Sequence, residues 1–320
     1  MLCAPALAFN LPPPRHTKLN PLHRAAPRIY STDRVRWAAS RAAPQYAHAH
    51  PVAHPVTVRG GEQDAPRAGP AGVFDKAVAL GAAKAGTPWR KLLPLGFASG
   101  VHIAFGAFLA VSVGGSVPGI KATDPGLQRI LLGAFGLPMG LLMTVCAGGE
   151  LVTGNFALCS AALAEGRTTR GALARNWAGA FLGNLAGSLI LAKLAAVAFT
   201  GVAASSVAVA TGKMSATLAQ TFARAILCNI LVCTAVWMAA SQADFASKAM
   251  AVFFPISGFV ALGLDHSVAN MFLVPFGMMN GAEIRALDFV TKNLIPVTLG
   301  NLVGGLFVGL VYQQVYSRKN

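Results

Sequence analysis

The sequence predicts an all-α membrane protein with six transmembrane helices. Of the 320 residues, 54% are hydrophobic and only 12% are charged, whereas soluble domains carry about 25% charged residues. Six apolar segments are each long enough to cross a bilayer core, which takes about 20 residues. Two of these segments have polar interruptions at matching places, and the second half of the chain repeats the pattern of the first.

Residues 1–70 differ from the rest of the chain in composition. They are rich in Ala, Pro, Arg and His, and acids are rare before Glu62 and Asp64. We expect such a segment to be disordered, and a cationic, acid-poor N-terminus is typical of a plastid transit peptide. We therefore expect a transit peptide and linker over residues 1–70, with a merely solvated basic tail as the alternative. Residues 71–320 then form the transmembrane domain.

The formal net charge of +15 does not indicate a nucleic-acid partner. Residues 1–60 hold eight Lys/Arg and one acid, so about half of the excess lies in the N-terminal segment and not on a folded face. The five cysteines form no C-x-x-C pair, and four of them lie in apolar runs. They are expected to be small buried side chains. We predict no metal and no cofactor.

A short amphipathic helix is expected at 74–85, on the membrane surface ahead of the first span. The six predicted spans are Leu92–Val113, Gln128–Ala164, Gly171–Gly201, Ala216–Ala239, Ala249–Asn280 and Val290–Tyr316. As a single helix the second span would run about 55 Å, well beyond a core of about 30 Å. It should therefore be broken at the glycine-rich run 147–155, and the fifth span has its own polar interruption at 263–270.

The two halves of the chain carry the same motifs in the same order. Arg175 and an Asn precede a G-N-L-x-G motif in span 3, and Lys292 and an Asn precede the same motif in span 6, at an offset of 117. Glu150-x4-Asn in span 2 matches Asp265-x4-Asn270 in span 5, at an offset of 115. Because three crossings end on the far side of the membrane, the second copy is inverted. Broken helices in such repeats meet near the midplane, where substrates bind.

Lys and Arg at the ends of the spans predict the orientation. Ten lie on the side of the N-terminus and five on the other, which favours both termini on the positive-inside face. In a plastid this face is the stroma.

His266 is the candidate functional residue at the break in span 5. A neutral imidazole there can donate a hydrogen bond or a proton to an anion, and a satisfied structural histidine is the alternative. Thr153, at the break in span 2, could bond to His266 or to the substrate, or act as a helix N-cap. His102 in span 1 is expected to be structural.

The remaining polar residues of the spans have more ordinary expected roles. Glu150 and Asp265 should tie down the broken helices by accepting backbone N–H bonds. Arg175 and Lys292 either attract anions into two vestibules or snorkel to the membrane surface. Four asparagines should link helices, namely Asn176, Asn184, Asn293 and Asn301.

Apolar residues beside the breaks could form hydrophobic constrictions, with lipid-facing or core packing as the alternative. These are Leu141, Leu151, Val152 and Phe259. Motifs of serine hydrolases, zinc proteases and phosphate-binding loops are missing, so an enzyme is not expected.

These residues resemble the formate/nitrite transporter family over residues 74–316. The runs that carry the resemblance are CAGGELVTGN, ARNWAGAFLGNLAG, LGLDHSVANMFLVPFGM and KNLIPVTLGNLVGGLFVG. The resemblance implies an aquaporin-like fold, a homopentamer with one pore per subunit, and transport of small monovalent anions such as formate, nitrite, bicarbonate or lactate. Algal members with plastid transit peptides are linked to nitrite or bicarbonate import.

Carried over by position, the resemblance makes His266 the central pore histidine and Thr153 its partner. It places constrictions at Leu141 and Phe259, and it adds Leu151 and Asn301 to the pore lining. Three residues depart from the family pattern: Arg175 stands for Lys, Asp265 for Glu, and Val152 for an aromatic residue.

We therefore predict a transporter of the chloroplast inner envelope for a small anion, with nitrite (or formate) as substrate and protons as possible co-substrates. The alternatives are a bicarbonate transporter, an aquaporin-like pore for neutral solutes, and a membrane scaffold. A neutral-solute pore would want an arginine in the constriction, and none lies at a break.

Overall fold

The structure is a computed structural model that describes residues 67–319. Residues 1–66, which carry most of the predicted transit peptide, lie outside the described residues. Between residues 67 and 319 all regular elements are helices.

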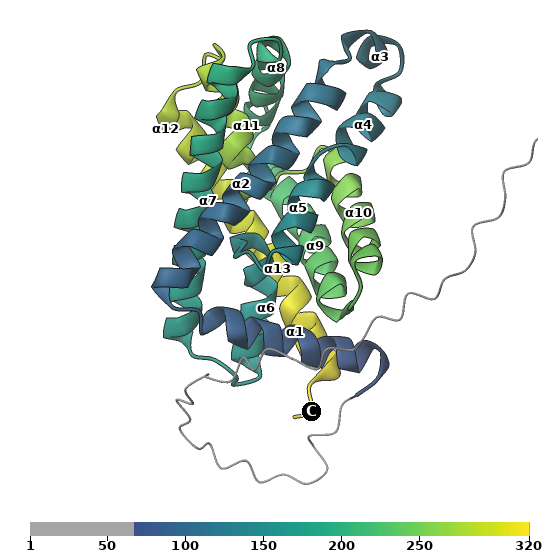
Figure 1. Ribbon diagram of the computed structural model, residues 1–320, viewed down its shortest axis with the longest axis vertical. Helices are drawn as coiled ribbons and strands as arrows, with labels where there is room; N and C mark the ends of the chain where they lie inside the picture. Colours follow the sequence, from purple (N-terminus) through teal and green to yellow (C-terminus); the bar gives the residue numbers. More distant parts are fainter. Residues whose placement is uncertain (1–66, 320) are drawn as a thin grey trace, which may run out of the picture. The chain divides into compact units, whose positions relative to one another are not determined.

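The helices, labelled in Figure 1, fall into two halves along the chain with corresponding elements. The first half contains α1 (Gly69–Ala85), α2 (Trp89–Val113), the 3-10 turn η1 (Gly114–Ser116), α3 (Pro118–Thr123), α4 (Pro125–Ala134), α5 (Leu137–Cys146), α6 (Val152–Ala164) and α7 (Arg170–Ala198). The second contains α8 (Ala203–Met214), α9 (Leu218–Ser241), α10 (Phe245–Ala261), α11 (Ser267–Met279), α12 (Ala286–Phe289), the π-helical turn η2 (Val290–Leu294) and α13 (Ile295–Tyr316).

Five helical stretches are long and apolar enough to cross a membrane. They are Trp89–Ser116, Pro125–Cys146, Arg170–Ala198, Leu218–Ser241 and Ala286–Tyr316. The remaining crossing, the fifth in chain order, consists of α10 and α11, each too short to span alone. This arrangement confirms the predicted class, in which the second and fifth crossings are broken.

Close helix packing in both halves depends on glycine. Helix α2 packs on α7 as α9 packs on α13. A Cβ atom added to Gly183 would lie 2.8 Å from the Cα of Gly96, and one added to Gly304 would collide with the carbonyl oxygen of Ile226. Small residues allow this approach of two backbones within a membrane.

Three features of the fold differ from the sequence predictions. The second crossing has an additional break between α4 and α5, where Gly136 has a φ of 155° that favours glycine. Helix α8, which the apolar pattern did not predict, is the counterpart of α1. Helix α1 is the expected helix, but it begins at Gly69 and packs on the bundle: Phe74 is buried, and a Cβ on Gly81 would collide with the carbonyl oxygen of Leu158.

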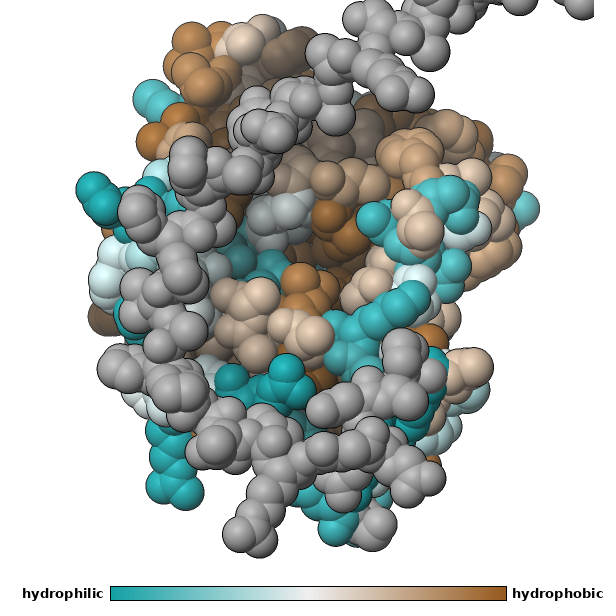
Figure 2. Space-filling model, turned by 60° about the horizontal axis from the view of Figure 1, so that its bottom comes forward, coloured by the Kyte–Doolittle hydropathy of each residue, from teal (hydrophilic) through white to brown (hydrophobic). Residues whose placement is uncertain are grey.

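Much of the exposed surface is formed by apolar side chains, as expected for helices in contact with lipid. Figure 2 views the end of the bundle at which α1 lies, where hydrophilic side chains gather, and hydrophobic ones prevail on the flanks beyond. Many large apolar side chains are exposed, among them Val197 at 71% and Leu194 at 60%.

Candidate functional site

The two broken helices end and restart in the same way. Helices α5 and α10 each end shortly before a glycine in the left-handed region, Gly148 with φ 71° and Gly263 with φ 73°. The chain then runs extended through Leu151 and His266, the residues that precede α6 and α11. Each break therefore exposes backbone N–H and carbonyl groups inside the bundle, and these groups need partners.

Asn184 supplies those partners at the first break. Its Oδ1 accepts from the backbone N–H of Val152 at 3.0 Å, and its Nδ2 donates to the carbonyls of Gly96 and Glu150, both at 2.8 Å. One fully buried amide thus connects α2, the break and α7.

Asn301 does the same at the second break. Its Oδ1 accepts from the N–H of Ser267 at 2.8 Å, and its Nδ2 donates to the carbonyls of Ala225 at 2.8 Å and Asp265 at 3.0 Å. The expected linking role of these asparagines is confirmed.

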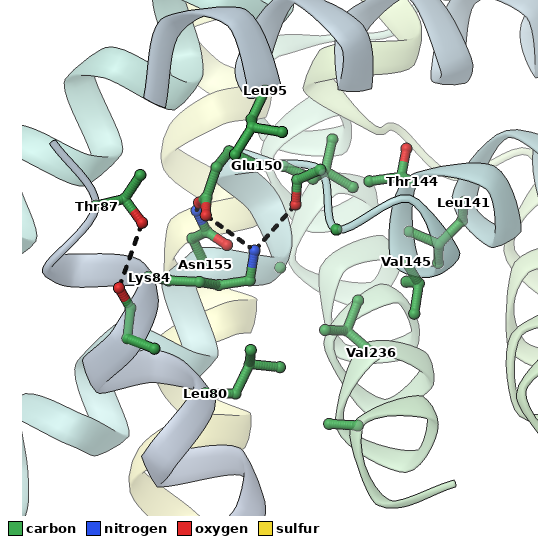
Figure 3. Close-up of a pocket in the computed structure, with 16 residues that line it drawn as sticks. Leu80, Lys84, Thr87, Leu95, Leu141, Thr144, Val145, Glu150, Asn155 and Val236 are labelled. Carbon is green, nitrogen blue, oxygen red and sulfur yellow. Dashed lines mark hydrogen bonds and ion pairs between the residues drawn. The ribbon is translucent and has the colours of Figure 1, made fainter. Parts of the chain in front are cut away.

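Glu150 is buried and holds a lysine at the first break. The Nζ atom of Lys84 lies 3.3 Å from Oε1 of Glu150 and donates to the carbonyl of Gly149 at 3.0 Å (Figure 3). The Nδ2 atoms of Asn155 and Asn176 donate to Oε2 of Glu150 at 2.7 and 3.1 Å.

Asp265 holds a second lysine in the same manner. The Nζ atom of Lys213 lies 3.0 Å from Oδ1 of Asp265 and donates to the carbonyl of Leu264 at 2.7 Å. Asn270 donates to Asp265 at 3.3 Å and to Oδ1 of Asn293 at 2.9 Å. The expectation that the two carboxylates accept backbone N–H groups is therefore wrong. Asparagine oxygens accept those groups, which leaves the carboxylates to pair with ammonium groups.

The basic residues singled out in the sequence lie elsewhere. Arg175 donates from Nη2 to the carbonyl of Ala85 at 2.9 Å. Lys292 is 61% exposed and pairs with Asp288 at 2.8 Å. Sequence reasoning missed Lys84 and Lys213 as site residues. In the structure each stands five residues before the first residue of the next long helix, α2 or α9, but the spans predicted from hydropathy begin at Leu92 and Ala216 and do not show this common spacing.

Three cavities run in series through the bundle. The α1 cavity, of about 300 Å³, is lined by Lys84, and the α8 cavity, of about 100 Å³, is lined by Lys213. A central cavity of about 10 Å³ shares Leu141 and Leu151 with the first, and Leu137, Phe259 and His266 with the second. Its remaining lining is Ile103, Val232 and Ile256.

The central cavity is an apolar slot with one polar side chain. A space of about 10 Å³ is at the limit of what one water molecule needs. His266 is the only residue in its lining that carries a polar side chain. An ion at this point has therefore lost its hydration, and only the imidazole can replace part of it.

Hydrogen bonds on both sides fix the tautomer of His266. The N–H of Ala269 donates to Nδ1 at 3.1 Å, so Nδ1 carries no proton and His266 caps α11. The proton of the ring is then on Nε2, which lies 2.9 Å from Oγ1 of Thr153. The imidazole is neutral in this arrangement.

The expected contact between Thr153 and His266 is present. Thr153 does not cap α6, whose N-cap position is Leu151, without a capping side chain.

Three residues expected in the pore lining take other positions. Val152 is 1% exposed, Thr153 and Asn301 are fully buried, and none of the three lines any of the cavities. Val152 donates its backbone N–H to Asn184, and the amide of Asn301 is used at the second break. Leu141, Leu151, Phe259 and His266 do line the cavities.

The chain resembles known transporters over most of its length. The family model described as formate/nitrite transporter matches residues 71–314. A probable formate transporter of Methanothermobacter thermautotrophicus is 39% identical over 272 residues, which cover 78% of this chain and 97% of that protein. The formate channel FocA of Escherichia coli (strain K12) is 33% identical over 245 residues, covering 69% and 84%.

Solved structures give the same result. A pentameric formate channel with formate bound has a TM-score of 0.62 at 31% identity and covers 71% of this chain and 97% of that chain. An FNT family ion channel has a TM-score of 0.64 at 29% identity, covering 76% and 98%. These relatives are transporters and channels, and their fold is the one predicted above. The chain is a multi-pass membrane protein and belongs to the formate/nitrite transporter family.

Proposed function

We propose that this family member carries nitrite through the three cavities as its main substrate. The observation that carries the proposal is the order of the cavities: a wide one with a lysine, a dry slot with His266, and a second wide one with a lysine. A path of this kind attracts an anion from either side and then removes its water.

Lys213 is the attracting group of the α8 cavity, and in the α1 cavity Lys84 lines the wall beside its partner Glu150, which lines it too. Lys213 lines the α8 cavity, whereas its partner Asp265 does not, so the ammonium faces the path and the carboxylate stands behind it. A positive group in a cleft with low-dielectric walls raises the local concentration of anions. Glu150 and Asp265 keep the two lysines in place at the breaks.

The apolar slot then selects the neutral form of the substrate. Leu141, Leu151 and Phe259 offer an ion no compensation for its lost hydration, so the anion crosses together with a proton that it acquires in a wide cavity. His266 remains neutral, because its Nδ1 accepts from the N–H of Ala269, and its Nε2 exchanges the hydrogen bond to Oγ1 of Thr153 for one to the passing acid. Thr153 fixes the orientation of the ring.

The size of the slot favours a substrate with few atoms. Nitrite and formate have three heavy atoms and bicarbonate has four, and the central cavity holds about 10 Å³. Between nitrite and formate, the proposed plastid location supports nitrite.

Uptake into proteoliposomes tests this substrate assignment. With labelled nitrite, formate and bicarbonate supplied separately, we expect nitrite uptake to exceed bicarbonate uptake at least about tenfold, the discrimination that one heavy atom gives in a tight apolar site. Leu151→Trp, which fills the slot, is the blocked control. Equal uptake of bicarbonate would overturn the assignment and favour a bicarbonate transporter.

We propose a homopentamer as the assembly, because a similar solved structure is a pentameric channel and large apolar side chains cover the flanks of the bundle. Native mass spectrometry in mild detergent should give five times the chain mass. A stable monomer under these conditions would contradict it.

We propose the inner chloroplast envelope as the location. The support is the acid-poor, basic composition of residues 1–70. A fluorescent reporter fused to these residues should enter plastids and become shorter on import, and a cytosolic or secreted reporter would contradict the proposal.

A further inference from the structure

A second candidate binding site lies outside the transport path, between α7, α11 and α12 (Figure 1). It is a groove of about 470 Å³ with an entirely apolar lining, which includes Leu189, Met278, Phe289 and Leu294. This volume is typical of sites for small organic ligands, which measure about 300–1,000 Å³. None of its lining residues belongs to the three cavities of the path.

Basic side chains stand along the groove on two of its elements. Arg285 directly precedes the lining residue Ala286, and Lys292 lies within η2, between the lining residues Val290 and Leu294. The side chains of Arg285 and Lys292 are 78% and 61% exposed. Both pair with Asp288, so one carboxylate serves two cations.

Lys193 adds a cation from α7. It follows the lining residue Leu189 by four positions, which places it about 6 Å further along the same side of the helix. It is exposed, and it makes no hydrogen bond or ion pair with any residue of the part that the structure describes. Of these three cations, two pair with Asp288, and the exposed Glu283 stands two positions before Arg285 in the chain.

We propose that this groove binds one anionic phospholipid, with an acyl chain along the apolar lining and the phosphate between Lys193, Arg285 and Lys292. An apolar groove bounded by basic residues near the ends of membrane helices has the polarity of such a lipid. A second copy of the chain fits less well, because burying Lys193 in an interface would leave a charge without a partner. The proposal does not depend on which anion the chain transports.

Native mass spectrometry of the full chain in detergent, titrated with phosphatidylglycerol or with phosphatidylcholine of the same acyl chains, tests the headgroup. We expect phosphatidylglycerol to bind about tenfold more tightly, and K193Q/R285Q/K292Q to abolish that difference. The control R90Q/K121Q/R129Q removes three exposed charges elsewhere and should leave it unchanged. Equal binding of the two lipids to the unmodified chain would overturn the proposal.

Leu189→Trp tests the groove. The indole should fill the apolar lining and weaken binding of both lipids, whereas Leu194→Trp, at a side chain 60% exposed on the same helix, should not. Thermal unfolding of both variants in detergent shows whether they are folded. Lipid binding that survives Leu189→Trp would contradict the assignment. The assignment would also be contradicted if Leu189→Trp left the binding of both lipids unchanged but formed a smaller oligomer, because the groove would then bind a second copy of the chain.

Discussion

Replacing Lys213 by Met should lower both the stability and the transport rate of the protein. The substitution leaves Asp265, whose side chain is 2% exposed, as a buried carboxylate without its cation. Breaking a buried ion pair by removing one partner costs about 3–5 kcal/mol. It also removes the ammonium group that lines the α8 cavity, so anion entry from that side should fall. Thermal unfolding in detergent and nitrite uptake measure the two effects.

The double variant K213M/D265N separates stability from transport. The amide that replaces the Asp265 carboxylate would keep an acceptor without a charge, so we expect most of the stability to return, while uptake stays at least about tenfold below that of the unmodified protein. Lys121→Met is the matched control, because Lys121 is an exposed lysine that lines none of the three cavities, and it should change neither property. Uptake that recovers together with stability would show that Lys213 is only structural.

The breaks and their asparagines could be predicted from the sequence because they are part of an internal repeat. The offsets of 115 and 117 align Glu150 with Asp265 and Asn184 with Asn301, and each pair occupies equivalent positions in the structure. A buried polar side chain in an apolar span needs a hydrogen-bond partner. When the same polar residue recurs in both halves of the repeat, its partner recurs as well.

The lysines could not be predicted from the same pattern, since they belong to helices outside the six spans. Lys84 lies in the last turn of α1 and Lys213 in the last turn of α8. The offset between them is 129, which does not match the repeat of the spans. Their side chains reach the cavities only because α1 and α8 pack against the bundle. Hydropathy shows that a helix is apolar on one face, but it does not show which cavity the end of that helix approaches.

Replacing His266 should change stability and uptake to a degree that depends on which hydrogen bonds the new side chain can form. Asn at this position has an oxygen where Nδ1 accepts from the N–H of Ala269, so it keeps the cap of α11, but its side chain is too short to reach the position of Nε2 beside Thr153. Leu can form neither contact. His266→Leu should therefore lose the cap of α11, at a cost of about 1 kcal/mol, together with the one hydrogen-bond donor of the slot, and its uptake should fall by about tenfold or more.

The external pH dependence of nitrite uptake by the unmodified protein and by His266→Asn is the most direct test of the central claim. That claim is that the substrate crosses the dry slot as a neutral acid past a neutral histidine. We expect uptake of both proteins to rise as the external pH falls, by about tenfold per pH unit while the protonated fraction of the substrate limits the rate. A folded His266→Asn protein whose uptake no longer varies with pH would show that the histidine itself supplies the proton, and it would contradict the claim.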